Sequence, residues 1–248
     1  METKDKISAL SDIGYHRKNN EDVAYVNTNQ YGSILLVADG MGGHRKGEVA
    51  SKLVLDNLAI PFLNYHKKFN TRRAKKFLKK YMKKANNEIY KLSLSGEEYM
   101  EMGTTAVSCI VGGKESVVFS VGDSRCYIIS SVDNSLKQIT KDQTYGQLLF
   151  DAGQFSKADL MSQPQRNLLI NAVGINPELT NAEEFVLTNS SYNSILLCSD
   201  GLYNMVSDSE IQEIMLMDVS TSEKTKLLIE KALANGGEDN VACSILDK

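Results

Sequence analysis

Five aspartates at the ends of predicted strands are the residues of this sequence best suited to chemistry. Each stands where an apolar or β-branched run begins or ends, with glycine or asparagine nearby. Strand ends can meet at one edge of a β-core, and carboxylates held at close quarters need a cation between them. The five residues are Asp22, Asp39, Asp123, Asp200 and Asp239.

The chemistry that this set suggests is that of a hard divalent cation. The set offers oxygen ligands with no histidine or cysteine, which suits Mg²⁺ or Mn²⁺ better than zinc. Gly40 follows Asp39 directly, and glycine lets the backbone turn sharply and come close to an ion or its waters. The alternative is that an Asp-Gly pair after a strand is only a turn. Because the pattern recurs at several strand ends, we favour the metal site.

Arg17 lies five residues before Asp22 and could serve the same site. A guanidinium beside a metal cluster can hold a phosphate through two parallel hydrogen bonds, which a lysine does less well. Two cations roughly 3.5–4 Å apart can polarise phosphoryl oxygens and deliver a bound hydroxide in line. The combination predicts phosphoester hydrolysis, and the alternative for Arg17 is a solvated loop charge.

Motifs of other hydrolases and of nucleotide-binding proteins are absent from the sequence. It contains no Cys-x5-Arg of a thiolate phosphatase, no HExxH and no GxSxG. Gly112-Gly113-Lys114 lacks the other residues of a P-loop, and Gly40-Met41-Gly42 lacks the third glycine of a dinucleotide-binding loop. A metal–carboxylate site remains as the hydrolytic option.

Composition and length describe an ordinary globular protein of one domain. The chain has 248 residues, of which 42% are hydrophobic and 24% charged. Its longest apolar runs, such as Ile34–Ala38, are far short of the ~20 residues that a membrane span needs, and its polar start lacks the apolar stretch of a signal peptide. The four cysteines lie in strand-like runs without a CxxC pair, as buried, reduced thiols do. We expect a cytoplasmic protein without a membrane span.

Charge is distributed unevenly along the chain. Residues 1–92 hold 18 Lys and Arg against 9 Asp and Glu, whereas residues 93–248 hold 10 against 22. Eight of the thirteen residues from 72 to 84 are basic. Such a run can bind nucleic acid or acidic phosphoproteins, but it also suits the solvated face of a helix. We favour the solvated face and expect no nucleic-acid partner.

The elements that must position these residues follow from the hydrophobic pattern. Strand-like segments are separated by short turns, which favours antiparallel sheets, and 142–172 is a polar, partly helical insert. Helices are expected where apolar residues recur at helical spacing, and Ser207 with Glu210 forms a capping box. Strands are predicted over 7–14, 22–27, 34–38, 104–111, 116–121, 125–131, 136–139, 184–187, 194–198 and 240–246, and helices over about 50–61, 71–95, 207–217 and 222–234.

Seven short motifs occur in a fixed order along the chain. They are Ser11-Asp12-x-Gly14-x-x-Arg17-x-x-Asn20-Glu21-Asp22, Asp39-Gly40-Met41-Gly42-Gly43-His44, Gly103-Thr104-Thr105-Ala106, Gly122-Asp123-Ser124-Arg125, Pro164-Gln165-Arg166-Asn167, Ser199-Asp200-Gly201-Leu202 and Glu238-Asp239-Asn240. In these motifs and their order the chain resembles the metal-dependent protein phosphatases of type 2C, over about residues 8–246. Its length and the form of the second motif are similar to the small, single-domain bacterial members.

The resemblance implies an α+β fold, a four-layer α-β-β-α sandwich of two antiparallel sheets flanked by helices. It implies one phosphatase domain over residues 1–248, in which 142–172 is a flap beside the active site. The implied activity is Mn²⁺- or Mg²⁺-dependent hydrolysis of phosphoserine and phosphothreonine in proteins. Two cations are implied, with a third, weaker site as in bacterial members.

The resemblance also implies a role for each matched residue. Asp39 would bridge the two metals, and the Gly40 carbonyl would bind one of them. Asp200 and Asp239 would complete the ligands of the second metal, while Arg17 would hold the substrate phosphate. The residues that would act through metal-bound waters are Glu21 and Asp22, and the carboxylate that would share a third metal with Asp200 is Asp123.

Two positions depart from the family pattern. Met41 stands where animal-type members carry a histidine that is a proposed general acid. His44, three residues later, is our candidate for protonating the leaving oxygen, with a metal-bound water or a solvated loop histidine as alternatives. The flap begins Lys141-Asp142-Gln143-Thr144 where bacterial members usually have Asp-His-Ser, so flap contacts and third-metal binding are where this chain would differ.

The expected partners are phosphoprotein substrates and a cognate Ser/Thr kinase, by resemblance a membrane-bound bacterial one that the phosphatase opposes. A monomer is expected. One alternative is a pseudophosphatase that has lost its metals, and the presence of Asp39, Asp200 and Asp239 argues against it. Another is a phosphatase of small phosphoesters such as nucleotides, which would use the same centre and differ only in access.

Overall fold

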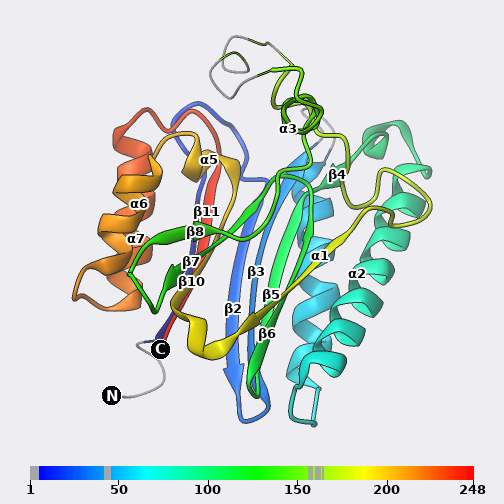
Figure 1. Cartoon of the computed structure of the whole chain (residues 1–248). Coiled ribbons are helices and arrows are strands. Elements are labelled where there is room, and N and C mark those ends of the chain that lie inside the picture. The colour runs from blue at the N-terminus through cyan, green and yellow to red at the C-terminus, as the bar shows by residue number, and fades with distance from the viewer. Residues whose placement is uncertain (1–5, 42–45, 156–158, 160–162, 164) are drawn as a thin grey trace.

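The strands of the computed structural model, which describes residues 6–41, 46–155, 159, 163 and 165–248, form two sheets (Figure 1). One, here the β10 sheet, has the order β1-β11-β10-β7-β8, and the other, the β3 sheet, follows the path β2-β3-β5-β6-β9 with β4 paired to β3. Each strand pair in them is antiparallel. The strands are β1 (Ile7–Asp12), β2 (Asp22–Asn29), β3 (Gly32–Met41), β4 (Gly103–Thr104), β5 (Ala106–Gly112), β6 (Glu115–Val121), β7 (Arg125–Ser130), β8 (Leu136–Gln138), β9 (Glu183–Thr188), β10 (Tyr192–Cys198) and β11 (Val241–Asp247).

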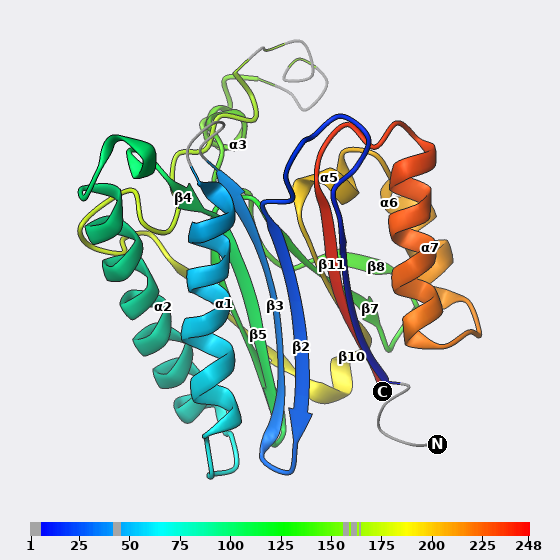
Figure 2. The same ribbon diagram turned by 180° about the vertical axis from the view of Figure 1, so that it is seen from behind.

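Helices cover the outer face of each sheet, so the molecule has four layers (Figures 1 and 2). α1 and α2 lie against the β3 sheet, whereas α6 and α7 lie against the β10 sheet. The helices are α1 (Gly47–Leu63), α2 (Thr71–Ser93), α3 (Tyr145–Asp151), α5 (Asp200–Tyr203), α6 (Asp208–Leu216) and α7 (Thr221–Ala234), with 3₁₀ turns η2 (Glu97–Tyr99) and η3 (Asn189–Ser191). The predicted α+β sandwich of two antiparallel sheets flanked by helices is confirmed.

The continuous apolar run of β3 explains how the layers hold together. Residues 34–38 are all 0% exposed, as expected for a strand without polar alternation. Ile34, Leu36 and Ala38 pack into a cluster with α1 and α2. Leu35 and Val37 point the other way, into the cluster between the two sheets. Because successive side chains alternate between faces, one strand contributes to both cores.

The predicted strand 104–111 is interrupted in the structure at Thr105. The residues before it form β4, which pairs with the end of β3, and the residues after it form β5. The Thr105 N–H donates to the Asp39 carbonyl at 2.8 Å, so a tertiary contact at the candidate site breaks the strand. The hydrophobic pattern alone is continuous here and could not show this break.

Helix ends agree best where the capping chemistry is explicit. The Ser207 side chain accepts from the Glu210 N–H and the Glu210 side chain accepts from the Ser207 N–H, so the predicted capping box is present. α1 runs beyond the predicted end near Pro61, as far as Leu63. A proline in the last turn removes one N–H donor without breaking the earlier turns.

The cysteines are structural and not nucleophilic. All four are buried free thiols, as predicted, and burial raises the pKa of Cys109 to about 12. Within the described part of the chain, we find no helix with the length and apolar character to cross a membrane.

Candidate active site

The strand-end aspartates meet at the end of the sandwich that lies below α3 (Figure 1). Asp22 begins β2 and is paired in register with Asp39 on β3. Asp200 begins α5 directly after β10, and Asp239 lies just before β11. Asp123 follows β6. The structure therefore brings together acids from both sheets and from both halves of the chain.

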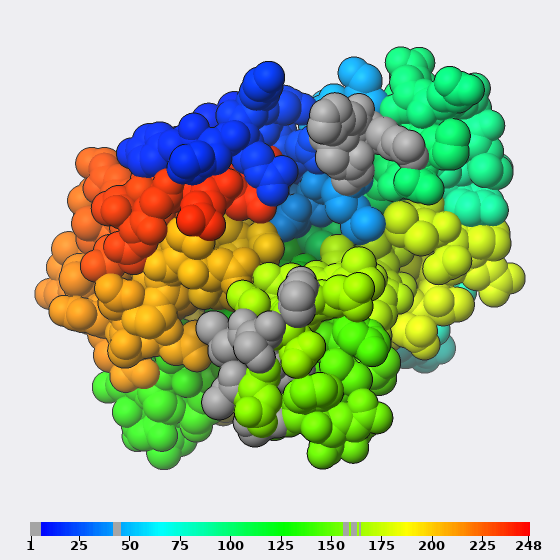
Figure 3. All heavy atoms as spheres, turned by 90° about the horizontal axis from the view of Figure 1, so that it is seen from above, coloured from blue at the N-terminus to red at the C-terminus, as the bar shows by residue number. Residues whose placement is uncertain are grey.

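A hollow of about 240 Å³ opens among these acids. From above, the blue N-terminal segment, the orange and red C-terminal segments and the yellow-green flap segment border this part of the face (Figure 3). Residues of the flap therefore help to enclose the acids. The lining includes Arg17, Glu21, Asp39, Gly40, Asp123, Asn167, Leu169, Asp200 and Asp239.

The backbone around Asp39 is fixed by hydrogen bonds with Thr104, at the end of β4, and with Thr105, which separates β4 from β5. The Asp39 N–H donates to Thr105 Oγ1 at 3.1 Å, and the Asp39 carbonyl accepts from Thr104 Oγ1 at 2.9 Å. Thr105 Oγ1 and Ser124 Oγ are also 2.7 Å apart. Sequence reasoning gave Thr105 no role, although it lies in one of the seven motifs.

Gly40 lies where two other segments approach the end of β3. Its N–H donates to the Glu21 carbonyl at 3.0 Å. A Cβ on Gly40 would lie 2.3 Å from the Gly47 carbonyl oxygen, at the start of α1. Only glycine fits this place, and its close approach keeps β2, β3 and α1 together at the site.

Burial raises the pKa values of Asp22, Asp39, Asp123 and Asp200, and neighbouring aspartates raise them further. Burial, with Asp200 and Asp239 adding to it, raises the pKa of Asp22 to about 7. Burial and Asp200 raise the pKa of Asp123 to about 8. The pKa of Asp39 is raised well above its usual range by burial and by the other four acids. Without a cation, these carboxyls hold protons in the neutral range.

The donor set fits a hard divalent cation, although the acids do not stand as a finished cage. Among the described residues, no three His, Cys, Asp or Glu side chains are gathered into a group that could hold an ion as they stand. Asp39 nevertheless lies near Asp22 and Asp200, and the pKa values of all three are raised, which favours their protonated forms. A cation would replace such protons and draw the oxygens together.

Arg17 and Asp239 form an ion pair at the rim of the hollow. The Arg17 Nη2 atom lies 2.7 Å from Asp239 Oδ2, and the Arg17 side chain is half exposed. One predicted phosphate ligand and one predicted metal ligand are thus partners in this structure. Because the guanidinium has five donors, it can keep this contact and still reach an anion in the hollow.

Glu21 is held by a residue to which sequence reasoning gave no role. Its N–H donates to Asn240 Oδ1 at 2.9 Å, and Asn240 Nδ2 donates to the carbonyls of Ile13 and Asn19 at 2.8 and 2.9 Å. Asn240, which directly follows Asp239, therefore connects this part of the chain to the loop that carries Arg17 and Glu21. Its place beside Asp239 in the last motif was the available signal.

Ser199 is a second such residue. Its hydroxyl donates to Asp22 Oδ2 at 2.6 Å and accepts from the Ala242 N–H at 2.9 Å. The side chain is 0% exposed and connects the β10 sheet to the first residue of β2. This hydrogen bond lowers the pKa of Asp22 and partly opposes the effect of burial. His44, the candidate acid, lies outside the described residues, and Met41 ends β3 and lines the hollow.

The flap is tied to the sheets by a partly buried ion pair at its base. Arg125 on β7 donates to Asp142 at 2.6 Å, and its guanidinium lies 3.5 Å from the centre of the Tyr203 ring. The Tyr203 hydroxyl in turn donates to the Asp123 carbonyl at 3.2 Å. One chain of contacts thus connects the flap, α5 and a candidate ligand.

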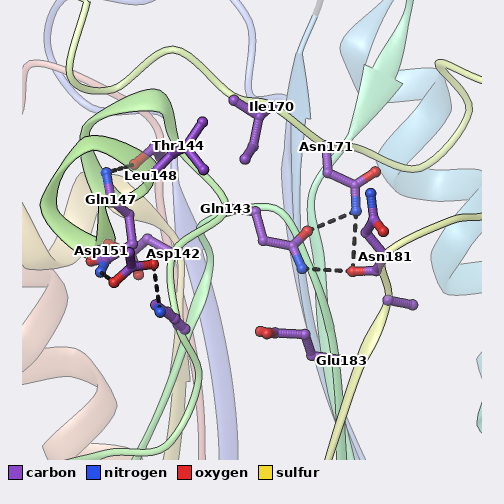
Figure 4. Close-up of a pocket in the computed structure, with 12 residues that line it drawn as sticks. Asp142, Gln143, Thr144, Gln147, Leu148, Asp151, Ile170, Asn171, Asn181 and Glu183 are labelled. Atoms are coloured by element: carbon purple, nitrogen blue, oxygen red, sulfur yellow. Dashed lines mark hydrogen bonds and ion pairs between the residues drawn. The ribbon is translucent and has the colours of Figure 1, made fainter. Parts of the chain in front are cut away.

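Gln143, where the sequence departs from the expected family pattern, forms a second attachment of the flap. Its Oε1 accepts from the Gly122 N–H at 2.9 Å and from Asn171 Nδ2 at 2.8 Å, while its Nε2 donates to the Asn181 carbonyl at 2.8 Å (Figure 4). Gly122 directly precedes Asp123. The departure from the family pattern therefore supplies flap contacts of its own.

A second hollow of about 530 Å³ lies beside the first and under α3. It shares Asp123, Asn167 and Asp239 with the acid-lined hollow, so the two are continuous at these residues. Its lining holds Arg125 and Arg166 together with Asp142, Glu238 and the shared acids. A chain that carried a phosphate into the first hollow could lie in the second.

Comparison with known proteins agrees with this geometry. Residues 15–235 match the protein phosphatase 2C family. The serine/threonine phosphatase stp of Listeria welshimeri is 35% identical over 239 residues, which cover 96% of this chain and 94% of that protein. The crystal structure of the serine/threonine phosphatase Stp1 from Staphylococcus aureus has a TM-score of 0.90 at 33% identity, over 98% of this chain and 94% of that one.

A further solved structure, the catalytic domain of the phosphatase PstP, contains two manganese ions. It has a TM-score of 0.83 at 33% identity and covers 98% of this chain and 97% of its own. The match extends over the whole sandwich, including the segments that carry the five acids. This chain therefore belongs to the protein phosphatase 2C family and is a protein phosphatase.

Proposed function

We propose that this chain, a serine/threonine protein phosphatase of the 2C type, hydrolyses phosphoserine and phosphothreonine in proteins at a centre of two divalent cations, Mn²⁺ or Mg²⁺. The observation that carries the proposal is the arrangement of four acids around Asp39, each of which raises its pKa. The two manganese ions of the PstP structure support the same stoichiometry here. When bound, the cations would polarise the phosphoryl oxygens and generate hydroxide from a water.

The proposal assigns the ligands by position. Asp39 lies at the centre of the cluster, so we assign it to both cations. Asp200 and Asp239 approach it from the β10 sheet, and the Gly40 carbonyl lies next to it on β3. The residues assigned to coordinated waters are Glu21 and Asp22, and the residue assigned with Asp200 to a third, weaker cation site is Asp123.

Arg17 is assigned to the substrate phosphate because it lines the hollow and is only half exposed beside Asp239. Its guanidinium would orient the phosphate and balance the charge of the entering anion. We keep His44 or a water as the donor of the proton to the leaving seryl or threonyl oxygen.

The wider context is proposed on the likeness to bacterial relatives. We propose that residues 1–248 act as one phosphatase domain and that 142–172 form the flap beside its substrate groove. The enzyme would work as a cytoplasmic monomer that opposes a Ser/Thr protein kinase. The second hollow, under α3, supports the role of the flap in substrate access.

The test replaces the central ligand without changing its size. Asp39→Asn should abolish Mn²⁺-dependent hydrolysis of a phosphothreonine peptide and weaken Mn²⁺ binding measured by calorimetry, while circular dichroism shows an intact fold. Asp56→Asn, on the exposed side of α1, is the matched control and should behave as the unaltered protein. Retained Mn²⁺-dependent turnover in Asp39→Asn would remove the metal assignment.

A further inference from the structure

A groove of about 530 Å³ lies at the end of the molecule opposite the aspartates, where α1 turns into α2 (Figure 1). Its volume is within the range of known ligand sites, about 300–1,000 Å³. Neither the metal centre nor the flap extends to it. The residues that give it its character are Tyr65, His66, Lys76, Phe77, Lys80 and Tyr81.

Aromatic rings give the groove a fixed apolar side. The rings of Tyr65 and Phe77 are 5.5 Å apart edge to face, and those of Phe77 and Tyr81 are 4.7 Å apart. Phe77 is 4% exposed and belongs to the core that packs α2 on the β3 sheet. The fold itself therefore holds this surface rigid, so an apolar side chain could bind there at low entropic cost.

The basic run of α2 gives the groove positive charge: Arg73, Lys76 and Lys80 line it, and within the described residues none of them has an acidic partner. Further basic residues continue beside the groove. Arg72, Lys76, Lys79 and Lys83 recur at intervals of four, three and four residues, so they share one exposed face. Within the described chain, none of these four forms an ion pair. The stripe is roughly 16 Å long at 1.5 Å per residue. Other cations of α2 do have acidic partners, as in Lys84 with Glu88 at 3.4 Å.

The position of this charge at the start of the helix is unfavourable for the helix itself. The first turn of α2 contains Arg72 and Arg73 and no acidic residue. Helix N-termini carry a partial positive charge and are stabilised by acids, typically by 0.3 to about 1 kcal/mol each. Exposure to solvent alone does not explain why basic residues lie at the start of this helix. An anion that binds there would be attracted both by the basic side chains and by the partial positive charge of the helix N-terminus.

We propose that this groove binds an acidic peptide segment with an apolar or aromatic side chain, present in phosphoprotein substrates away from the phosphorylated residue. The inference names a substrate class and so rests on the proposed function. Carboxylates of the segment would contact Lys76 and Lys80, and its apolar side chain would lie against Phe77 and Tyr81.

Two other polyanions fit the groove less well. Nucleic-acid-binding domains are usually strongly basic, with a pI above about 9, whereas this chain has a net charge of −3 and a pI of about 5.7. An anionic membrane binds apolar side chains that protrude between basic ones. The apolar side of this groove does not protrude, because it includes the buried side chain of Phe77. A peptide segment fits better, because it can place one apolar side chain against the rings and its carboxylates beside the lysines that line the groove.

The distance between the two ends of the molecule sets a requirement for the substrate. The 23 residues of α2 alone span roughly 35 Å at 1.5 Å per residue. An extended chain covers at most about 3.3–3.6 Å per residue, so on the order of ten residues must separate the acidic segment from the phosphorylated residue. A linked substrate of that length would gain affinity by raising the effective concentration of the phosphate at the metal centre.

The first arm of the test measures binding without catalysis. Fluorescence anisotropy would follow a fluorescein-labelled peptide in which one phenylalanine is flanked by aspartates and glutamates. The double variant Lys76→Glu/Lys80→Glu should raise Kd at least tenfold, and added salt should weaken binding to the unaltered protein. Lys91→Glu/Lys114→Glu has the same charge change at exposed positions away from the groove and should bind normally. Equal Kd values for the two double variants, or preference for an oligouridylate or for anionic phosphatidylglycerol vesicles, would overturn the proposal.

The second arm measures turnover of a phosphothreonine peptide joined to the same acidic segment by a linker of about twelve or of two residues. The long linker should lower KM several-fold in the unaltered protein and not in Lys76→Glu/Lys80→Glu. Both proteins should hydrolyse para-nitrophenyl phosphate at the same rate. Failure of that hydrolysis in the unaltered protein counts against the proposed function, whereas normal hydrolysis with no effect of the linker counts against the groove.

Discussion

Gly40 is a residue at the site whose size the surrounding backbone restricts. A Cβ there would lie 2.3 Å from the Gly47 oxygen and 2.7 Å from the Glu21 oxygen, and both are backbone atoms. We expect Gly40→Ala to lower the free energy of unfolding by about 1–3 kcal/mol and to weaken Mn²⁺ binding. Thermal denaturation and calorimetry would measure both. Gly96→Ala is the control, since nothing lies within 4 Å of that position.

Arg17 is the other residue whose replacement separates two effects. Its charge-assisted hydrogen bonds to a phosphate would contribute about 1.5–3 kcal/mol, so Arg17→Ala should raise KM for a phosphothreonine peptide roughly 10- to 150-fold. The effect on kcat should be smaller. Lys18→Ala, the adjacent exposed cation, should leave KM near its original value. An unchanged KM in Arg17→Ala would contradict the assignment of this residue to phosphate.

At the scale of elements, the attachment of the flap depends on Gln143. Removing its side chain leaves the buried Gly122 N–H without the acceptor that lies 2.9 Å away. An unsatisfied buried donor costs about 1–3 kcal/mol, and 1 kcal/mol shifts the melting temperature of a protein of this size by roughly 2–4 °C. Gln143→Ala should therefore melt several degrees lower. Gln147→Ala, which removes only an exposed contact to Asp151, should melt within about a degree of the original protein.

Most elements were predictable because the period of the hydrophobic residues and the positions of the turn residues indicate the same helices and strands along this chain. The strand over 34–38 and the capping box at Ser207 are examples, since each depends on neighbours in sequence. The break at Thr105 depends instead on Asp39, which is distant in sequence and hydrogen-bonds to it. The attachment of Gln143 to Asn171 and Asn181 is tertiary in the same way and leaves no local pattern.

At the scale of the whole molecule, the raised pKa values make stability without metal depend on pH. A carboxyl whose pKa is higher in the folded than in the unfolded protein stabilises the fold fully below its unfolded value, near 4, and this stabilisation is lost as pH rises through the folded value. Those values are about 7 for Asp22 and about 8 for Asp123. Stability in EDTA should therefore fall between pH 5 and pH 8.5.

Melting temperatures measured across that pH range with EDTA and with Mn²⁺ would check this expectation. Mn²⁺ supplies the positive charge that the protons supply at low pH, so the increase in melting temperature on adding Mn²⁺ should be largest near pH 8. Asp39→Asn should show a smaller increase. A melting temperature in EDTA that stays constant or rises from pH 5 to pH 8.5 would contradict the assigned pKa directions.

The convergence of acids from both halves of the chain was predictable because each acid marks a strand end, and strand ends share the edges of sheets. Their exact neighbours were not, because Ser199 and Asn240 contact the site across the gap between sheets. Nor did the sequence show the groove between α1 and α2. The basic run was visible, but Tyr65 and Phe77 meet beside it only after the helices pack.

The place of β11 bears on the synthesis of the enzyme. β11 lies between β1 and β10, and Asp239 lies two residues before it, yet a ribosome makes every other strand of the two described sheets first. Until residues 239–247 leave the ribosomal exit tunnel, the β10 sheet lacks one of its inner strands. The aspartate cluster lacks one of its acids for the same time. A nascent chain in which residues 239–247 have not yet joined the β10 sheet therefore lacks part of the acid cluster, and we expect it not to dephosphorylate proteins until β11 is inserted.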